Sequence, residues 1–283
     1  MCALEMNPDE STKLQSTNAA RHARHTAMLP VTVRVQDGWE RSLAEYSRRM
    51  LSFRQMDCDY CVWQMLQLCV DPKRVYRTTS YHSNTKQQWA RDDPAFLLVL
   101  FYMLIVAAIG WYLALGRGGL LSLLQLVLYV ILIDFLALGA LLASFGWWLS
   151  NSFLHERDGG ISHLHHERRV EWVEWRYAFD VHCNAFVPVF VLLYLLQYLL
   201  LPLLLSEGIF VSLLSNVLYA VAFSCYHYLT FLGYSELPYL RNCEYFVYPV
   251  GLVLAAFVSS LPATLRSGFS CTWFVAGMYF GVD

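Results

Sequence analysis

Apolar residues gather in five long runs after residue 95, and polar residues are mostly confined to the breaks between these runs. A helix needs about 20 apolar residues to cross roughly 30 Å of hydrocarbon, and each run reaches that length. Core helices of a soluble domain rarely give five such runs. The pattern therefore predicts an all-α, multi-pass membrane protein with about five transmembrane helices, over Phe96–Leu115, Leu120–Leu149, Cys183–Leu205, Ile209–Gly233 and Tyr245–Leu265.

The segments outside these runs have other patterns. Residues 1–40 are polar and lack the apolar stretch of a signal peptide, which predicts a disordered cytosolic tail. Residues 41–95 are expected to form a cytosolic or interfacial helical region before a transmembrane domain over 96–265. Residues 266–283 are expected to form a short lumenal tail, in which "CTWFVAGMYF" is too short to span and is expected to lie at the membrane interface.

An amphipathic helix is predicted within the region before the first run. Met56, Tyr60 and Trp63 recur at spacings of three or four, and Leu66 or Gln67 continues the series. The pair Asp71-Pro72 marks the expected end of this helix. Two roles remain open: the helix packs onto the membrane domain, or it lies in the cytosolic interface with its arginines near anionic head groups.

Composition and charge placement support the membrane reading and give an orientation. The chain is 57% hydrophobic and 15% charged, against about 45–50% and about 25% in soluble domains. Of its 20 Lys and Arg residues, only Arg117 and Arg266 fall on the side opposite to the N-terminus. Because Lys and Arg collect in cytosolic segments, the N-terminus is predicted to be cytosolic and the C-terminus lumenal.

Two polar clusters precede predicted transmembrane helices. In "QWARDDPAF", Asp92 or Asp93 is expected to cap the first helix with Pro94 next, because Asp accepts from the free N–H groups of a first turn and Pro suits its first position. Arg91 and the two Asp residues are alternatively a contact surface for a partner. In "YAFDVHCNAFVP", Asp180 or Asn184 is expected to cap the third helix.

Metal binding was weighed for the second cluster and is not expected. His182 and Cys183 are types of residue that bind metals, and His163, His165 and His166 lie nearby in sequence. A metal site needs three or four converging ligands, and these residues match no known spacing. The loop over 155–169 that holds the three histidines is not otherwise explained.

Asp134 lies near the middle of the second predicted helix. A charged residue there costs at least about 2.5–3.5 kcal/mol on insertion scales, so it should face the interior of the bundle. A polar residue such as Asn216 is expected to bond it. Intramembrane carboxylates also mark ion and proton paths. The alternative function is therefore a small transporter or membrane enzyme that uses Asp134 with Asp180, His182 and His227.

Other chemistry is not indicated. The sequence has no GxSxG, HExxH or glycine-rich phosphate loop, so no catalytic residue and no cofactor is expected. Cys58 and Cys61 form a lone CxxC without a second pair. A net charge of −2 leaves no large basic surface, and no nucleic-acid binding is inferred from the residues.

Five segments together resemble the uncoordinated-fifty family of Golgi membrane proteins: "LSFRQMDCDYCVWQML", "DPKRVYR", "TKQQWARDDPAF", "EWRYAFDVHCNAFVPVF" and "TFLGYSELPYL". The resemblance covers roughly residues 45–265. It implies a five-span protein with a cytosolic N-terminus that acts in vesicular trafficking at the Golgi. It also implies association with large Arf guanine-nucleotide exchange factors and with transport of receptors to the cell surface. It brings no catalytic residues.

A cytosolic partner needs a surface, and the segment 45–91 is the longest that faces the cytosol in this topology. It is rich in the Trp, Tyr, Met and Arg residues that are enriched at interfaces. The residues expected to bind a partner, with Trp63, Arg74 and Tyr76 as exposed anchors, are Trp63, Arg74, Tyr76, Arg77 and Arg91.

The predicted orientation can be tested with engineered glycosylation sites. Sites near Gly118 and in a lengthened C-terminal tail should be modified, because both are predicted to face the lumen. Sites in the loop 155–169 should stay unmodified. The measurement is the shift in gel mobility that a glycosidase removes. Modification of that loop would overturn the orientation.

Overall fold

The computed structural model describes residues 58–78, 89–91, 94–155 and 172–281. The chain divides into a unit over Met1–Ser47, which lies outside these residues, and a unit over Arg48–Asp283 that holds every described helix. Most of the described residues are helical, and the single β-bridge among them joins His155 to Leu240. Asp92, Asp93, the tail over 1–40 and the His-rich residues 156–171 lie outside the described residues.

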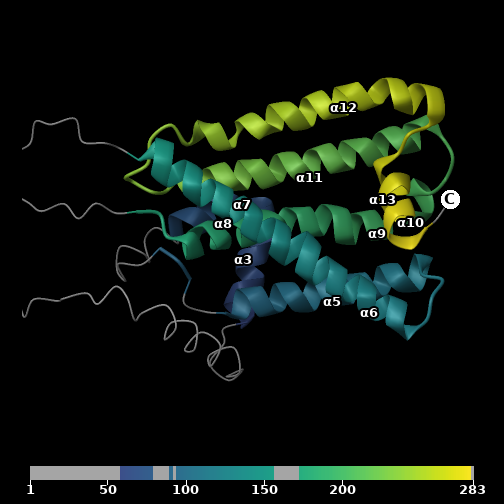
Figure 1. The fold of residues 1–283 in the computed structure, drawn as a ribbon, viewed down its shortest axis with the longest axis horizontal. Coiled ribbons are helices and arrows are strands. Elements are labelled where there is room, and N and C mark those ends of the chain that lie inside the picture. Colours follow the sequence, from purple (N-terminus) through teal and green to yellow (C-terminus); the bar gives the residue numbers. More distant parts are fainter. Residues whose placement is uncertain (1–57, 79–88, 92–93, 156–171, 282–283) are drawn as a thin grey trace, which may run out of the picture. The chain divides into compact units, whose positions relative to one another are not determined.

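Five helices are long and apolar enough to cross a membrane, as predicted. The first is α5 (Ala95–Leu115), and the second, Leu120–Leu154, consists of α6 (Leu120–Tyr129), η2 (Val130–Ala137), α7 (Leu138–Leu149) and η3 (Ser150–Leu154). The third helix, Trp175–Leu199, consists of α8 (Trp175–Val189), η4 (Phe190–Leu196) and α9 (Gln197–Leu199). The fourth is α11 (Ile209–Ser235), and the fifth, Cys243–Ser267, consists of η5 (Cys243–Phe246) and α12 (Tyr248–Ser267). The shorter helices are α3 (Cys58–Val70), α10 (Leu201–Leu204) and α13 (Cys271–Phe280) (Figure 1).

The third helix differs most from its prediction. It begins at Trp175 rather than at Cys183. The polar residues on either side of Cys183 fit within the helix because they have hydrogen-bond partners inside the bundle. Asp180 and Asn184 therefore lie within the helix, and the expectation that either caps its start is wrong. Glu174 occupies the N-cap position. The other four helices begin and end within five residues of the predicted bounds.

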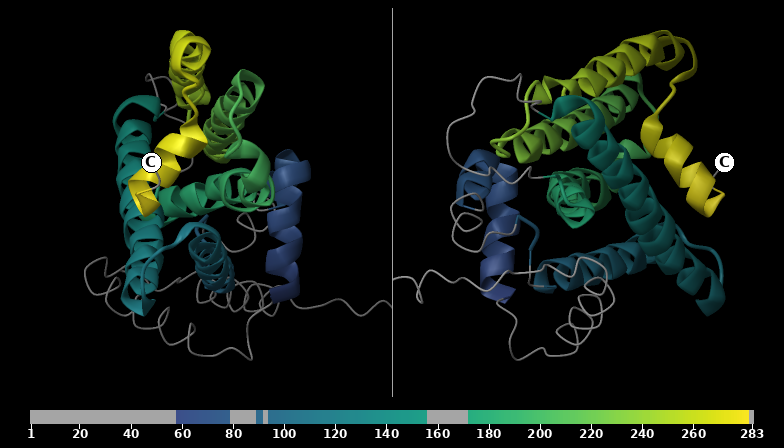
Figure 2. Two further views of the ribbon diagram at one scale, coloured as in Figure 1. Left: turned by 90° about the vertical axis from the view of Figure 1, so that its right-hand side faces the viewer. Right: turned by 60° about the vertical axis from the view of Figure 1, so that its left-hand side comes forward.

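The third helix is also the centre of the bundle. In its most apolar window 56% of the residues are buried, against 6% in the fifth helix. The right-hand view of Figure 2 shows α8 nearly end-on, with α11 above it, α5 below it and the second helix to one side. A helix buried on most sides can keep polar residues only where each has a partner.

Irregular turns occur where helices exchange polar contacts. The stretches η2 and η4 are π-helical, and η4 follows Pro188, which lacks the N–H that a regular helix needs. The carbonyl oxygen of Tyr194 in η4 accepts a hydrogen bond from the Trp111 indole at 3.0 Å. This bond joins α5 to the third helix.

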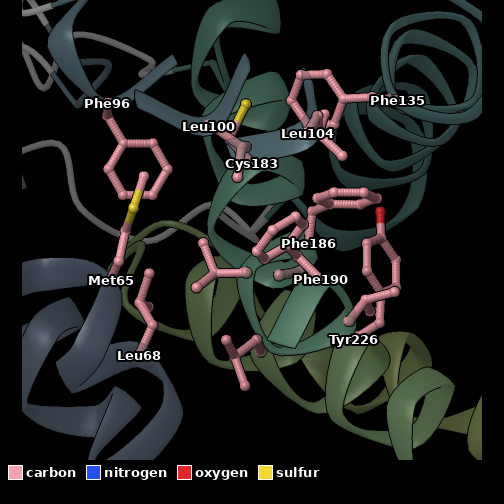
Figure 3. Packing of buried hydrophobic residues seen from close by; sticks show 14 of the residues in the cluster. Met65, Leu68, Phe96, Leu100, Leu104, Phe135, Cys183, Phe186, Phe190 and Tyr226 are labelled. Carbon is pink, nitrogen blue, oxygen red and sulfur yellow. The ribbon is translucent and has the colours of Figure 1, made fainter. Parts of the chain in front are cut away.

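The apolar core is built around Phe135 of η2, which is fully buried. Its ring lies 4.9 Å from Phe186, 5.7 Å from Phe101 and 5.3 Å from the His182 ring, measured between centroids. Such aromatic pairs contribute about 0.5–1.5 kcal/mol beyond the area that they bury. Figure 3 shows this cluster, with Met65 of α3 pointing toward Phe96 of α5.

Two glycines let the second helix approach its neighbours closely. A Cβ on Gly139 would lie 2.3 Å from Nε2 of His182, and one on Gly146 would lie 2.5 Å from the Tyr234 hydroxyl. Real Cβ atoms do not come so near to other atoms. The His182 ring is held by Phe135 and by other aromatic rings, so it has little room to move aside.

Gly139→Ala should therefore destabilise the bundle by about 1–3 kcal/mol, the usual cost of overpacking a core. Gly251→Ala is the matched control, because a Cβ at Gly251 meets nothing within 4 Å. That change should be neutral or stabilising, since Ala favours helices more than Gly by about 1 kcal/mol. Thermal unfolding of the purified protein in detergent measures both. Equal effects of the two changes would contradict the close packing at Gly139.

Candidate functional site

The two polar clusters singled out in the sequence meet in the structure. The Arg91 backbone N–H donates to Oδ2 of Asp180 at 2.7 Å, and the Arg91 guanidinium donates to Oδ1 of Asn184. The Arg176 guanidinium donates in turn to the Arg91 carbonyl oxygen at 3.1 Å. Asp180 and Asn184 are four residues apart, so they share one face of α8. The four residues form a polar cluster where α5 begins, which we call the Arg91 cluster.

The Arg91 side chain also packs against the start of α5. Its guanidinium carbon lies 3.9 Å from the centroid of the Phe96 ring, a cation–π contact. Its Nη1 atom is buried without a hydrogen-bond partner in the part of the chain that the structure describes. The helix α5 begins at Ala95, directly after Pro94. A role of Arg91 in partner binding remains a prediction, and its side chain is half-buried.

The short helix α3 packs on α5 and α8 through one face. Its buried residues are Cys61, Gln64, Met65 and Leu68. Tyr60, Trp63 and Leu66, whose spacing predicted the helix, lie on the opposite side and are exposed, as expected for Trp63. Both faces of α3 carry large apolar residues, so their spacing alone does not select the buried face. The predicted end of this helix at Asp71 is confirmed.

The outward side of α3, together with Arg74 beyond its C-terminal end, forms an exposed aromatic face, defined here as Tyr60, Trp63, Leu66 and Arg74. The exposed fractions are 41% for Tyr60, 36% for Trp63 and 63% for Leu66. The Tyr60 and Trp63 rings stack at 5.7 Å, and the Arg74 guanidinium lies 6.0 Å from the Trp63 centroid. These contacts hold the two rings in one arrangement at the surface.

Two of the predicted partner-binding residues differ in their placement. Arg77 is exposed. Tyr76 is 3% exposed, so the expectation that it is an exposed anchor is wrong. Tyr76 lies against Gly233 of α11, where the missing side chain makes room for the ring.

Burial raises the pKa of the Tyr76 phenol. Burial also raises the pKa of the nearby Glu236 carboxyl, and Arg77 opposes that shift.

The partner of Asp134 was not predicted correctly. The Tyr279 hydroxyl of α13 donates to Oδ2 of Asp134 at 2.5 Å. Asn216 bonds elsewhere, because its amide donates to Oγ1 of Thr264 at 2.9 Å and accepts from the Cys271 N–H at 2.8 Å. Little in the sequence indicated Tyr279 as the partner. It is a residue with one hydroxyl group near the end of an apolar segment that is too short to span a membrane.

The other intramembrane polar groups have separate partners. Nδ1 of the buried His182 is 2.9 Å from the Tyr226 hydroxyl, whereas Asp180 bonds to Arg91 and Asp134 bonds to Tyr279. His227 is packed beside Tyr226 and is half-buried. A shared reaction centre would need these groups to converge, and they do not bond to one another.

Among the residues that the structure describes, no three His, Cys, Asp or Glu side chains are grouped so that they could hold a metal ion. His163, His165 and His166, which were considered as ligands, lie outside the described residues.

Comparisons with known proteins agree on one family. A sequence profile of the UNC-50 family matches residues 46–280. The unc-50 homolog of Dictyostelium discoideum is 39% identical over 243 residues, covering 86% of this chain and 89% of that protein. The human unc-50 homolog is 41% identical (77% and 80%), and unc-50 of Caenorhabditis elegans is 38% identical (77% and 69%). No solved structure matches significantly. The chain belongs to the UNC-50 family.

Proposed function

We propose that this protein is a non-enzymatic membrane adaptor of the Golgi, with its N-terminus in the cytosol. Its cytosolic side recruits a trafficking protein such as an Arf guanine-nucleotide exchange factor, and it supports transport of receptors to the cell surface. The family resemblance supplies the Golgi, the exchange factor and the receptors. The observation that carries the adaptor role is the exposed aromatic face of α3.

The aromatic face has the composition of a binding surface. Trp, Tyr and Arg are the residue types that most often dominate binding energy at protein interfaces. Tyr60 and Trp63 are already stacked, and Arg74 already lies over Trp63. A partner would therefore lose little side-chain entropy in ordering them. The opposite face of α3 is anchored on α5 and α8, so the surface is presented on a fixed support.

The distribution of Lys and Arg along the chain also favours the cytosolic side as the side that binds a partner. The region before residue 95 holds most of the Lys and Arg residues of the chain, which favours a cytosolic location for α3. Arg74 of the aromatic face is an exposed cation, and Arg77, three residues further along the chain, is a second one. An acidic rim on a partner would complement them and increase the rate of association.

The alternative of a transporter or membrane enzyme is less well supported. It required Asp134, Asp180 and His182 to act together, and each is bonded to a different residue. Each of these hydrogen bonds offsets the cost of burying a polar group in an apolar bundle, so the three residues have a structural role.

Trp63→Ala and the pair Arg74→Glu and Arg77→Glu should each weaken binding of a large Arf exchange factor. Loss of an aromatic anchor costs about 2 kcal/mol or more, roughly a 30-fold rise in Kd. Deleting residues 1–40 should leave binding intact, because Trp39, at the end of this segment, is its single Trp, Tyr or Phe residue. The measurement is the Kd of the exchange factor for purified protein in lipid nanodiscs.

Trp172→Ala is the matched control. Trp172 is an exposed Trp that stacks on His155 and is not part of the aromatic face, so its loss should leave the Kd unchanged. If the deletion abolishes binding while the α3 changes have no effect, the adaptor surface lies in the tail and the proposal fails.

A further inference from the structure

An apolar cavity of about 250 Å³ lies inside the bundle, at the end where α5 connects to α6. Residues of α5, the second helix, the third helix, α11 and α13 line it, among them Ala108, Leu126, Val130, Leu193 and Phe223. An apolar cavity of about 150 Å³ in a protein core stays dry and binds benzene. A larger apolar cavity within a membrane domain has hydrocarbon chains as its nearest available occupants.

The helix α13 closes this cavity on one side and is held at both of its ends. Near its start, the Cys271 N–H donates to Asn216 at 2.8 Å and the Thr272 N–H donates to the Ser215 hydroxyl at 2.9 Å. These bonds satisfy N–H groups that the first turn of a helix leaves free. Near its end, Tyr279 bonds to Asp134. Figure 1 shows α13 at the same end of the helices as α9 and α10.

The polar atoms of the cavity wall are bonded to one another. The Gln197 amide donates to the Tyr219 hydroxyl at 3.1 Å and to Oγ1 of Thr272 at 3.0 Å. The Asp134 carboxyl accepts from Tyr279. Because these groups already have partners, the wall offers an entering molecule mostly apolar contact. A polar solute would lose hydration there without full compensation.

A second cavity, of about 460 Å³, adjoins the first and has both polar and apolar groups in its wall. Leu126, Met278, Tyr279 and Phe280 line both cavities. The second cavity is also lined by Tyr112, Ser122, Gln125 and Arg117. Arg117 is exposed and is one of two cations that the sequence places on this side of the membrane.

We propose that the two cavities form a binding site for one glycerophospholipid, with one acyl chain in the apolar cavity and the phosphate beside Arg117. A guanidinium binds phosphate through paired, charge-assisted hydrogen bonds, and the neighbouring hydroxyl and amide groups add donors. The apolar cavity has room for part of one chain and not for two, so the second chain stays in the bilayer. In the proposed orientation this lipid belongs to the lumenal leaflet.

The site is independent of the adaptor surface. The aromatic face of α3 lies where α5 begins, whereas both cavities lie where α5 ends. Loss of lipid binding with normal recruitment, or the reverse, would separate the two proposals experimentally.

The experiment uses the full chain in nanodiscs with a trace of phosphatidylglycerol that carries a photoactivatable diazirine on one acyl chain. After irradiation, mass spectrometry maps the labelled residues. We expect labels on buried wall residues such as Ala276 and Val130, which lipid around the bundle does not reach. Arg117→Gln should reduce that labelling about tenfold, the effect of losing one charged hydrogen-bonding group.

Matched variants separate the site from general lipid contact. Ala276→Leu fills the apolar cavity and should remove the label from its wall. Ala263→Leu adds the same side chain on the exposed surface of α12 and should change nothing. Arg266→Gln removes the other cation on this side, which lines neither cavity, and should also change nothing. Arg117→Gln is an exposed substitution, so it keeps the test valid if Ala276→Leu does not fold.

Two results would overturn the proposal. The first is label confined to exposed faces such as that of α12, in which case the cavities hold no phospholipid. The second is stronger labelling of the same wall residues by a photoactivatable sterol than by the phospholipid, with no dependence on Arg117. That result would assign the apolar cavity to a sterol.

Discussion

The bonds from Arg91 to α8 are the contact on which the arrangement of this protein depends. Taking a guanidinium out of water is costly unless it is paired and hydrogen-bonded. On the most buried helix of the bundle, Asn184 accepts from the guanidinium and Asp180 accepts from the Arg91 backbone N–H. The chain enters α5 only a few residues later, so these bonds fix where the first transmembrane helix begins against the central helix. They also fix the support on which α3 packs.

The two ends of the helices then carry different chemistry. At the Arg91 end, α3 lies with one face on α5 and α8 and presents the other outward. At the opposite end, α13 folds against α11 and forms one wall of an apolar cavity that adjoins a more polar one. The aromatic cluster around Phe135 separates the two ends. An adaptor surface and a lipid site can therefore exist in one small bundle without sharing residues.

Length and hydropathy were enough to predict five helices, because the width of the bilayer constrains both. They failed where polar residues are satisfied by distant partners. Asp180 looked like a cap because its bond to Arg91, 89 residues away, is invisible in the local sequence. Tyr279 was missed as the partner of Asp134 for the same reason, at a separation of 145 residues. The sequence did not single out the packing face of α3, because both of its faces carry apolar residues.

A double-mutant cycle between Arg91 and Asn184 measures how much the contact between these two side chains stabilises the bundle. The variants Arg91→Met, Asn184→Ala and their combination would be compared with the parent protein by equilibrium unfolding in detergent micelles. We expect a coupling energy of about 1.5–3 kcal/mol, typical of a hydrogen bond to a charged group. Additive effects, within about 0.3–0.5 kcal/mol, would show that the two side chains act independently and that the bundle does not depend on their contact.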